Sequence, residues 1–218
     1  MNITLDELKE RVIKLVENNA CEQKSRAWLV AAYVSLQTAH ELNYVDDTFH
    51  SFSIQEQIDT LKSIAETRIF AIDISSKDKG QQSNAVVWLR GFYFNDAIIR
   101  MAALSERGLV SLWELINIDP RNCKIVMNKT CQYNYCKLKD WYENIFNEDL
   151  EAVNKVRKQV NVFKHRPRIS GLLAIDRIDD AIFALSKVIN ILENTIKKSD
   201  DRIKKAHENW CKQRFRKK

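Results

Sequence analysis

One short segment of the chain combines residue types that could act on a phosphodiester. Residues 154–166 read Asn-Lys-Val-Arg-Lys-Gln-Val-Asn-Val-Phe-Lys-His-Arg, so one imidazole stands among cationic and amide side chains. A guanidinium binds phosphate oxygens in a fork, and an imidazole with an ordinary pKa of about 6.5 can take up or release a proton near neutrality. The segment therefore offers the two groups that proton-transfer catalysis at a phosphate would use.

Helix geometry indicates which of these side chains share one side of a helix. At 100° per residue, about 20° separates His165 from Lys158, and about 40° separates it from Asn161. Arg157 lies about 80° away from His165 by the same geometry. A second interpretation stays open, because a helix C-terminus favours Lys and Arg through its dipole and His165 could cap the last carbonyl groups without any ligand.

Apolar residues at three- and four-residue steps predict helices along most of the chain. Two capping boxes, Thr4 to Glu7 and Ser53 to Glu56, mark helix starts, because the Thr or Ser and the Glu satisfy first-turn amides. The expected helices cover about residues 5–18, 22–42, 54–72, 85–118, 136–146, 148–164 and 172–218. The polar segment 73–84 is expected to be an exposed loop.

Single residues refine these boundaries. Asn147 should cap the helix that follows it, and Pro167 should end that helix near His165. Gly91 and Gly108 each cost about 1 kcal/mol relative to Ala inside a helix, so each is expected to mark a close packing contact. Gly108 is also a candidate for a break in its helix.

Composition favours one all-α domain. With only 4 Gly and 2 Pro, the sequence excludes collagen and turn-rich all-β folds, and 45% hydrophobic residues exclude a disordered chain. No stretch resembles a linker between two cores, so residues 1–218 are expected to form a single domain. The prediction is a helical bundle of about six to seven helices with a long C-terminal helix.

The sequence also predicts a cytoplasmic protein that does not enter a membrane. No stretch approaches the ~20 apolar residues of a membrane span, and the N-terminus lacks the pattern of a signal peptide. Five cysteines at irregular spacing argue against a disulfide framework. Because Cys123, Cys131 and Cys136 lack zinc-ligand spacing and no phosphate-loop or dinucleotide motif is present, we expect no metal and no cofactor.

Positive charge is concentrated late in the chain. Residues 1–73 hold 7 Lys/Arg against 12 Asp/Glu, whereas residues 121–168 hold 11 against 5. The tail, residues 202–218, holds 8 Lys/Arg against one acid. Such segments could attract nucleic acid or another anionic surface, although a solvated, frayed helix end has the same composition.

The chain resembles the HEPN superfamily of helical proteins over about residues 85–200, with the basic tail beyond. One shared feature is the long helix containing Val87-Trp88-Leu89-Arg90-Gly91-Phe92-Tyr93-Phe94-Asn95-Asp96-Ala97-Ile98-Ile99-Arg100. The others are the Arg157-to-His165 pattern near the end of a later helix, the final long helix, and the all-helical length. The family motif places four to six residues between Arg and His, whereas seven stand between them here.

What the resemblance implies is a homodimeric, metal-independent endoribonuclease. In that reading Arg157 stabilises the phosphate charge, and His165 is the general acid or base during attack by the ribose 2′-hydroxyl. Such proteins act in bacterial toxin and phage-defence systems, so an antitoxin or another defence-system protein is an expected partner. The expected RNA contacts around the catalytic pair are Lys158, Asn161, Lys164, Arg166 and Arg168.

Two other functions stay open, so whether the chain is an enzyme is undecided at this level. The family includes inactive members, and a non-catalytic adaptor or nucleic-acid-binding bundle would have the same charge pattern. A helical interaction protein with no nucleic-acid role is the third interpretation. The remaining histidines, His40, His50 and His207, are expected at the surface or in hydrogen bonds. The clustered aromatic residues Trp88, Phe92, Tyr93 and Phe94 are expected in the core.

Overall fold

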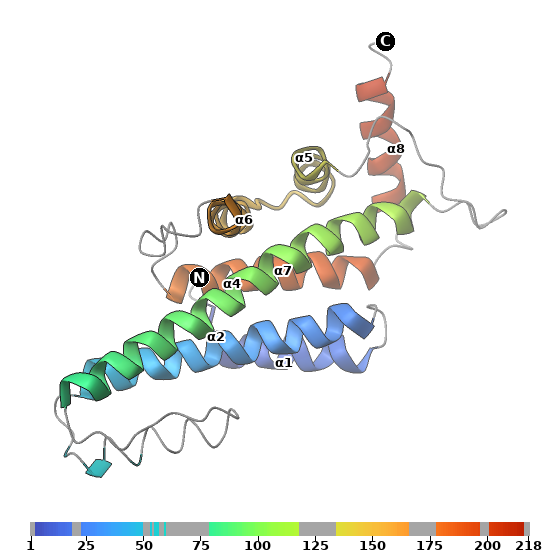
Figure 1. Ribbon diagram of the computed structural model, residues 1–218. Coiled ribbons are helices and arrows are strands. Elements are labelled where there is room, and N and C mark those ends of the chain that lie inside the picture. Colours follow the sequence, from blue (N-terminus) through green and yellow to red (C-terminus); the bar gives the residue numbers. More distant parts are fainter. Residues whose placement is uncertain are drawn as a thin grey trace. The chain divides into compact units, whose positions relative to one another are not determined.

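The fold is all-α, as the sequence predicts. The structure is a computed structural model that describes residues 3–18, 23–49, 53, 55–56, 59, 79–117, 134–165, 178–196 and 201–215. These residues contain seven helices and no strand (Figure 1). The helices are α1 (Leu5–Glu17), α2 (Gln23–Phe49), α4 (Lys79–Asn117), α5 (Tyr135–Phe146), α6 (Glu151–His165), α7 (Ile178–Ile196) and α8 (Asp201–Phe215).

The chain divides into two compact units. One unit contains residues 1–33 and 98–218, and the other contains residues 34–97. In the larger unit α6 and α1 both pack on α7, and α5 packs on α8. Its core is apolar and includes Leu8, Leu15, Ile98, Leu104, Leu109, Leu112, Trp141, Val153, Val156, Leu185, Val188 and Ile189. The single domain expected from the sequence stays a prediction.

The smaller unit combines apolar burial with polar contacts between α2 and α4. The hydroxyl of Ser35 donates to Asp96 at 2.7 Å, and Arg90 donates to Asn43 at 3.2 Å. Its buried apolar residues are Leu36, Ala39, Leu42, Tyr93, Phe94 and Ala97. The expectation of a core position is therefore confirmed for Tyr93 and Phe94. It is wrong for Phe92, which is 54% exposed, while the side chain of Trp88 lies outside the described residues.

Both capping boxes form as predicted. The Thr4 side chain accepts from the amide of Glu7, and the Glu7 carboxylate accepts from the amide of Thr4. Ser53 and Glu56 exchange the same pair of bonds, at 2.7 and 3.3 Å. These amides would otherwise lack an intrahelical acceptor, which is why the boxes locate helix starts. Most of the helix expected over 54–72 lies outside the described residues.

Helix α4 begins earlier than its sequence suggests. Residues 79–84 were expected in an exposed loop, but they form its first turns, so that part of the prediction is wrong. The residues 73–78 of the expected loop lie outside the described part. A helix can extend into a polar stretch that has few Gly or Pro residues and no apolar stripe. Each added residue gains a backbone hydrogen bond, so lengthening an existing helix costs little free energy.

The two glycines of α4 differ in their surroundings. A Cβ on Gly108 would lie 2.9 Å from Cγ2 of Ile191 and 3.3 Å from Cδ2 of Leu192, so α7 approaches α4 closely there. A Cβ on Gly91 would meet no atom of the described residues within 4 Å. The close contact is thus confirmed at Gly108 and wrong at Gly91. The expected break is also wrong, because α4 runs through Gly108 without interruption.

The connection between α5 and α6 corrects the role of Asn147. This residue ends α5 in the left-handed conformation, with φ 52° and ψ 41°, rather than capping α6. Asn tolerates that conformation better than most residues, which suits a helix C-terminus. Helix α6 instead begins at Glu151, whose amide donates to the Asp149 carboxylate at 2.9 Å. The last described residue of α6 is His165, so the helix extends to the position where Pro167 predicts its end.

The last part of the chain contains two described helices, α7 and α8. The sequence predicts one helix from about residue 172 to the end. Residues 197–200, between the two helices, lie outside the described part, so a single long C-terminal helix is not shown. Helix α7 is amphipathic and carries most of the core residues of this region, whereas α8 is more polar and contains residues 202–215 of the basic tail.

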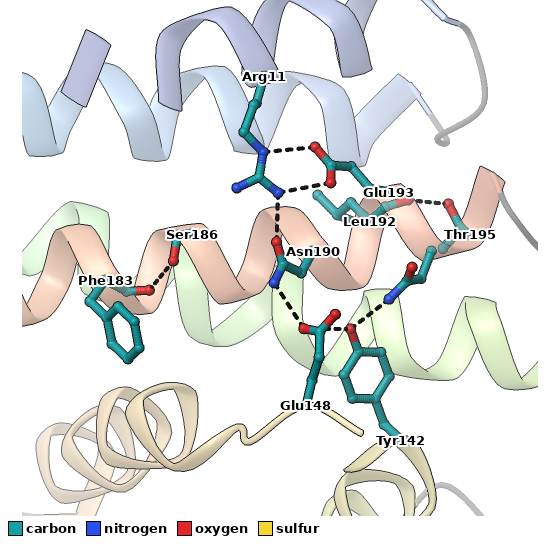
Figure 2. Close-up of polar contacts among 10 residues, drawn as sticks. Arg11, Tyr142, Glu148, Phe183, Ser186, Asn190, Leu192, Glu193 and Thr195 are labelled. Carbon is teal, nitrogen blue, oxygen red and sulfur yellow. Dashed lines mark hydrogen bonds and ion pairs between the residues drawn. The ribbon is translucent and has the colours of Figure 1, made fainter. Parts of the chain in front are cut away.

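A chain of polar contacts joins α1, α7, α5 and the α5–α6 connection (Figure 2). Arg11 of α1 pairs with Glu193 of α7 at 2.8 Å and donates to Asn190 at 2.6 Å. The amide of Asn190 donates to Glu148 at 2.8 Å. Glu148 in turn accepts from the hydroxyl of Tyr142, so the connection that leads into α6 is bonded to both α7 and α5.

Candidate functional site

Helix α6 has a buried side and an exposed side. Val153, Val156 and Val160 are at most 5% exposed and face the core, where α6 packs on α7. Lys155 and Lys158 are exposed, and Asn161 is partly exposed. By helix phase Lys155 and Lys158 lie on the side opposite the valines, and Asn161 lies at the flank between the two sides. The exposed side of α6 therefore presents two ammonium groups and an amide to solvent.

Arg157 does not join that exposed group. Its Nε donates to Oε1 of Glu106 on α4 at 2.5 Å, and its guanidinium carbon lies 4.1 Å from the centre of the Tyr135 ring on α5. The side chain is 26% exposed and Glu106 is 47% exposed, so the pair lies at the surface. The structure thus separates Arg157, which contacts α4 and α5, from the solvent-facing Lys158.

The other predicted site residues can be located only in part. His165 is the last residue of α6, and its side chain and that of Lys164 lie outside the described residues. Arg166 and Arg168 lie outside them entirely. Eight residues of helix raise His165 about 12 Å along the axis from Arg157, since each residue adds 1.5 Å. Whether Arg157 and His165 converge on one phosphate stays a prediction.

Arg157 borders a pocket of about 430 Å³ in the larger unit. Its lining comes from four helices: α2, α4, α5 and α6. The lining residues are Trp28, Ala103, Glu106, Arg107, Val110, Tyr135, Leu138 and Arg157. The pocket therefore combines an apolar wall with an indole, a phenol ring, two guanidinium groups and one carboxylate. Trp28 is 38% exposed, which is high for so large an apolar side chain.

Tyr135 of this pocket combines a buried ring with a hydroxyl that lacks a hydrogen bond among the described residues. It is 5% exposed, and its buried hydroxyl has no hydrogen-bond partner among the residues that the structure describes. Burial raises the pKa of Tyr135 well above its usual value, and the nearby Arg157 lowers it by less. The phenol is therefore neutral at physiological pH and serves as an apolar surface under the Arg157 guanidinium.

Sequence reasoning found Arg157 but not the residues around it. Trp28, Glu106 and Tyr135 belong to helical stripes or to segments without a motif, and nothing local marks them. Glu106 and Arg157 are 51 positions apart in the chain. The one signal in the sequence is that Glu106 has only apolar residues three and four positions away in its helix, so no basic residue of the same helix can pair with it.

His207 is buried, at 8% exposed, in a cluster of aromatic rings. Its Nδ1 accepts from the indole N–H of Trp141 at 3.1 Å, and its ring packs against that of Trp113 with centres 5.1 Å apart. Burial lowers the pKa of His207, which keeps it neutral. The prediction of a hydrogen-bonded histidine is confirmed for His207; His50 lies outside the described residues, and His40 is exposed.

The tautomer of His207 limits what it can do to Cys211. Because Nδ1 is an acceptor, the proton of the neutral ring is on Nε2, which lies 3.6 Å from the sulfur of Cys211. A base must have a free lone pair, so His207 in this tautomer cannot take the thiol proton. The Cys–His pair is therefore not arranged as a nucleophile and its general base.

Two features are absent from the part of the chain that the structure describes. No group of three or more His, Cys, Asp or Glu lies close enough together to hold a metal ion there. Among the described helices, none has the length and apolar character needed to cross a bilayer.

Comparison of the chain with protein-family models, with curated proteins and with solved structures gave no match. Function therefore has to be inferred from the geometry and chemistry of the residues themselves.

Proposed function

We propose that this chain is a HEPN-like helical protein that binds RNA through the exposed side of α6. The observation that carries the proposal is the solvent-facing position of Lys155 and Lys158 on a helix whose opposite side is fixed in the core. Ammonium groups on a rigid helix can contact successive phosphates, and each neutralised phosphate releases bound counterions, which supplies most of the binding free energy. Asn161 adds an uncharged hydrogen-bonding group next to them.

The basic segment that follows α6 in sequence extends this surface in the proposal. Lys164, Arg166 and Arg168 stand within ten residues of Lys158, and a single strand of RNA is flexible enough to follow such a stretch. A homodimer, as the family resemblance implies, would bring two copies of the segment to one RNA.

Binding is the first function to test because cleavage has a further requirement. For Arg157 to stabilise a phosphate in the transition state, its guanidinium has to exchange Glu106 for phosphate oxygens. An exposed ion pair contributes only about 0–1 kcal/mol, so this exchange is energetically accessible. Cleavage by Arg157 and His165, without a metal, is therefore the catalytic form of the same proposal.

The test compares two double variants that remove equal charge. Lys155→Gln with Lys158→Gln should weaken binding of single-stranded RNA by about tenfold at low salt and reduce the slope of log affinity against log salt by about 1.4. Lys9→Gln with Lys14→Gln removes two exposed lysines of α1 and should leave both quantities nearly unchanged. Equal losses in the two variants, or affinity that ignores ionic strength, would contradict the proposed RNA surface.

Cleavage is measured in the same preparation. Labelled RNA is incubated with the purified protein and EDTA, and the catalytic form predicts products that His165→Ala abolishes while RNA binding persists. If the protein binds RNA but never cleaves it, the non-catalytic form of the proposal holds and the catalytic form is wrong. Sedimentation of the free and RNA-bound protein measures whether a homodimer forms.

A further inference from the structure

The pocket between α2, α4, α5 and α6 is separate in chemistry from the lysine face of α6. We propose that this pocket binds a small aromatic anion, with the ring against Trp28 and the anionic group at Arg157 and Arg107. The proposal does not depend on RNA binding by the lysines of α6, and it shares only Arg157 with the catalytic form of the proposed function. Two sources of such a ligand are a free mononucleotide and an aromatic carboxylate.

The size and lining of the pocket set the class of ligand. A volume of about 430 Å³ lies within the range of small-molecule sites and exceeds what isolated waters require. Ala103, Val110 and Leu138 supply an apolar wall, and Trp28 supplies a partly exposed indole face. A flat aromatic ring would stack on the indole and bury apolar surface there. A purely polar ligand would gain neither contribution from the apolar wall.

The charged groups of the pocket indicate where the anion would lie. Arg157 and Arg107 both line the cavity, and the guanidinium carbon of Arg157 lies over the Tyr135 ring, 4.1 Å from its centre. A guanidinium fixed in this way has lost much of its rotational freedom, so it binds carboxylate or phosphate oxygens at a smaller entropic cost. The buried Tyr135 provides the surface that fixes it.

Glu106 occupies the position that the ligand anion would take. Its carboxylate pairs with Arg157 and is 47% exposed, so it can turn to solvent without a large desolvation cost. In the proposed complex a ligand carboxylate or phosphate replaces Glu106 on the guanidinium. Glu106 then limits affinity, both by competing for Arg157 and by repelling the incoming anion.

This exchange predicts effects of opposite sign on the two members of one ion pair. Measured by titration calorimetry with AMP, Glu106→Gln should tighten binding by about threefold, because competition and repulsion are both removed. Arg157→Gln should weaken binding by about tenfold, because a charge-assisted hydrogen bond is lost. Trp28→Ala should weaken it by at least about fivefold through lost stacking. Lys9→Gln on α1 serves as the control with no expected change.

Four probes separate the ring from the anion and one source from the other. AMP carries both groups, adenosine only the ring, inorganic phosphate only the anion, and indole-3-acetate is the aromatic carboxylate. The proposal expects AMP or indole-3-acetate to bind at about 1 mM or below, and adenosine and phosphate to bind much more weakly. Binding of one aromatic anion and not the other identifies the source.

Three results would overturn the proposal. They are no heat of binding with either aromatic anion, equal binding of phosphate and AMP, and Glu106→Gln binding no tighter than the parent. A gain in affinity cannot come from misfolding, so Glu106→Gln tests the idea even where Trp28→Ala or Arg157→Gln unfolds the protein. RNA binding is measured separately through Lys155 and Lys158, so the two proposals can fail independently.

Discussion

The two ends of α5 each bury a tyrosine, and the surroundings of the two rings differ. At the C-terminal end Tyr142 is fully buried, and its hydroxyl accepts from Asn194 at 2.8 Å and donates to Glu148 at 3.3 Å. At the N-terminal end Tyr135 is almost as buried, but its hydroxyl has no partner among the described residues. Burial is the largest cause that raises the pKa of both phenols.

The difference separates a structural end of the helix from one suited to binding. The Tyr142 hydroxyl is part of a hydrogen-bond network, and this network reaches α1 through Asn190 and Arg11 (Figure 2). Around Tyr135 the nearest charged group, Arg157, is held by a surface carboxylate that solvent or a ligand can replace. Satisfied buried networks favour one arrangement, whereas incompletely satisfied pockets retain capacity for a partner.

The largest expected effect is at the satisfied end. Tyr142→Phe should lower the free energy of unfolding by about 1–3 kcal/mol, because the buried Asn194 amide loses its acceptor and Glu148 loses a donor. Urea unfolding followed by circular dichroism measures the change. A loss below about 0.5 kcal/mol would mean that the network adds little stability, and the contrast between the two ends would disappear.

A smaller effect is expected from pH, through the neighbouring Trp141–His207 contact. Burial lowers the pKa of His207 in the folded protein, so the unfolded chain, with an ordinary His pKa of about 6.5, binds a proton more readily. The contribution of His207 to the free energy of unfolding should therefore be constant above about pH 7. It should fall as the pH decreases below about 6.5. Glu208 opposes the shift without cancelling it.

The control for this pH effect is the same titration of His207→Gln. Urea midpoints of parent and variant measured between about pH 5 and 8 should converge toward low pH, because the variant lacks the titrating ring. Other histidines and the carboxylates contribute equally to both proteins and cancel in the difference. Parallel curves would show that His207 titrates alike in the folded and unfolded states.

The smallest effect is expected at the open end. Tyr135→Phe should change the free energy of unfolding by less than about 0.5 kcal/mol or increase it, because the removed hydroxyl is desolvated without a partner. The ring that supports Arg157 is kept. A loss as large as that of Tyr142→Phe would reveal a partner for this hydroxyl and remove the distinction between the two ends of α5.

The sequence predicted the start of a helix correctly where that start depends on interactions between residues close together in the chain. The Thr4–Glu7 and Ser53–Glu56 boxes, for example, involve residues only three positions apart in the chain. The role of Asn147 did not follow from the sequence, because Asn is common at both the start and the end of a helix. The choice depended on two hydrogen bonds, in which the amide of Leu150 donates to Glu143 and the amide of Glu151 donates to Asp149.

The candidate site was predicted less completely than the helices. The helical period predicted a shared side of α6 for Lys158 and Asn161, and in the structure Lys158 is exposed and Asn161 partly exposed. The period also put Arg157 within reach of that group, but the structure has this side chain against Glu106 and Tyr135 instead. No local pattern encodes which distant residue an arginine at the edge of a helix face will contact.

The sequence by itself determined that this chain is helical and where several helices begin and end, because capping, helical period and scarcity of Gly and Pro act within a few residues. Only the tertiary structure decided that Gly108, and not Gly91, lies against another helix, and that Trp28, Glu106 and Arg157 line one pocket. Those facts depend on how helices far apart in the chain pack together, and packing is fixed by side-chain shape across the whole core.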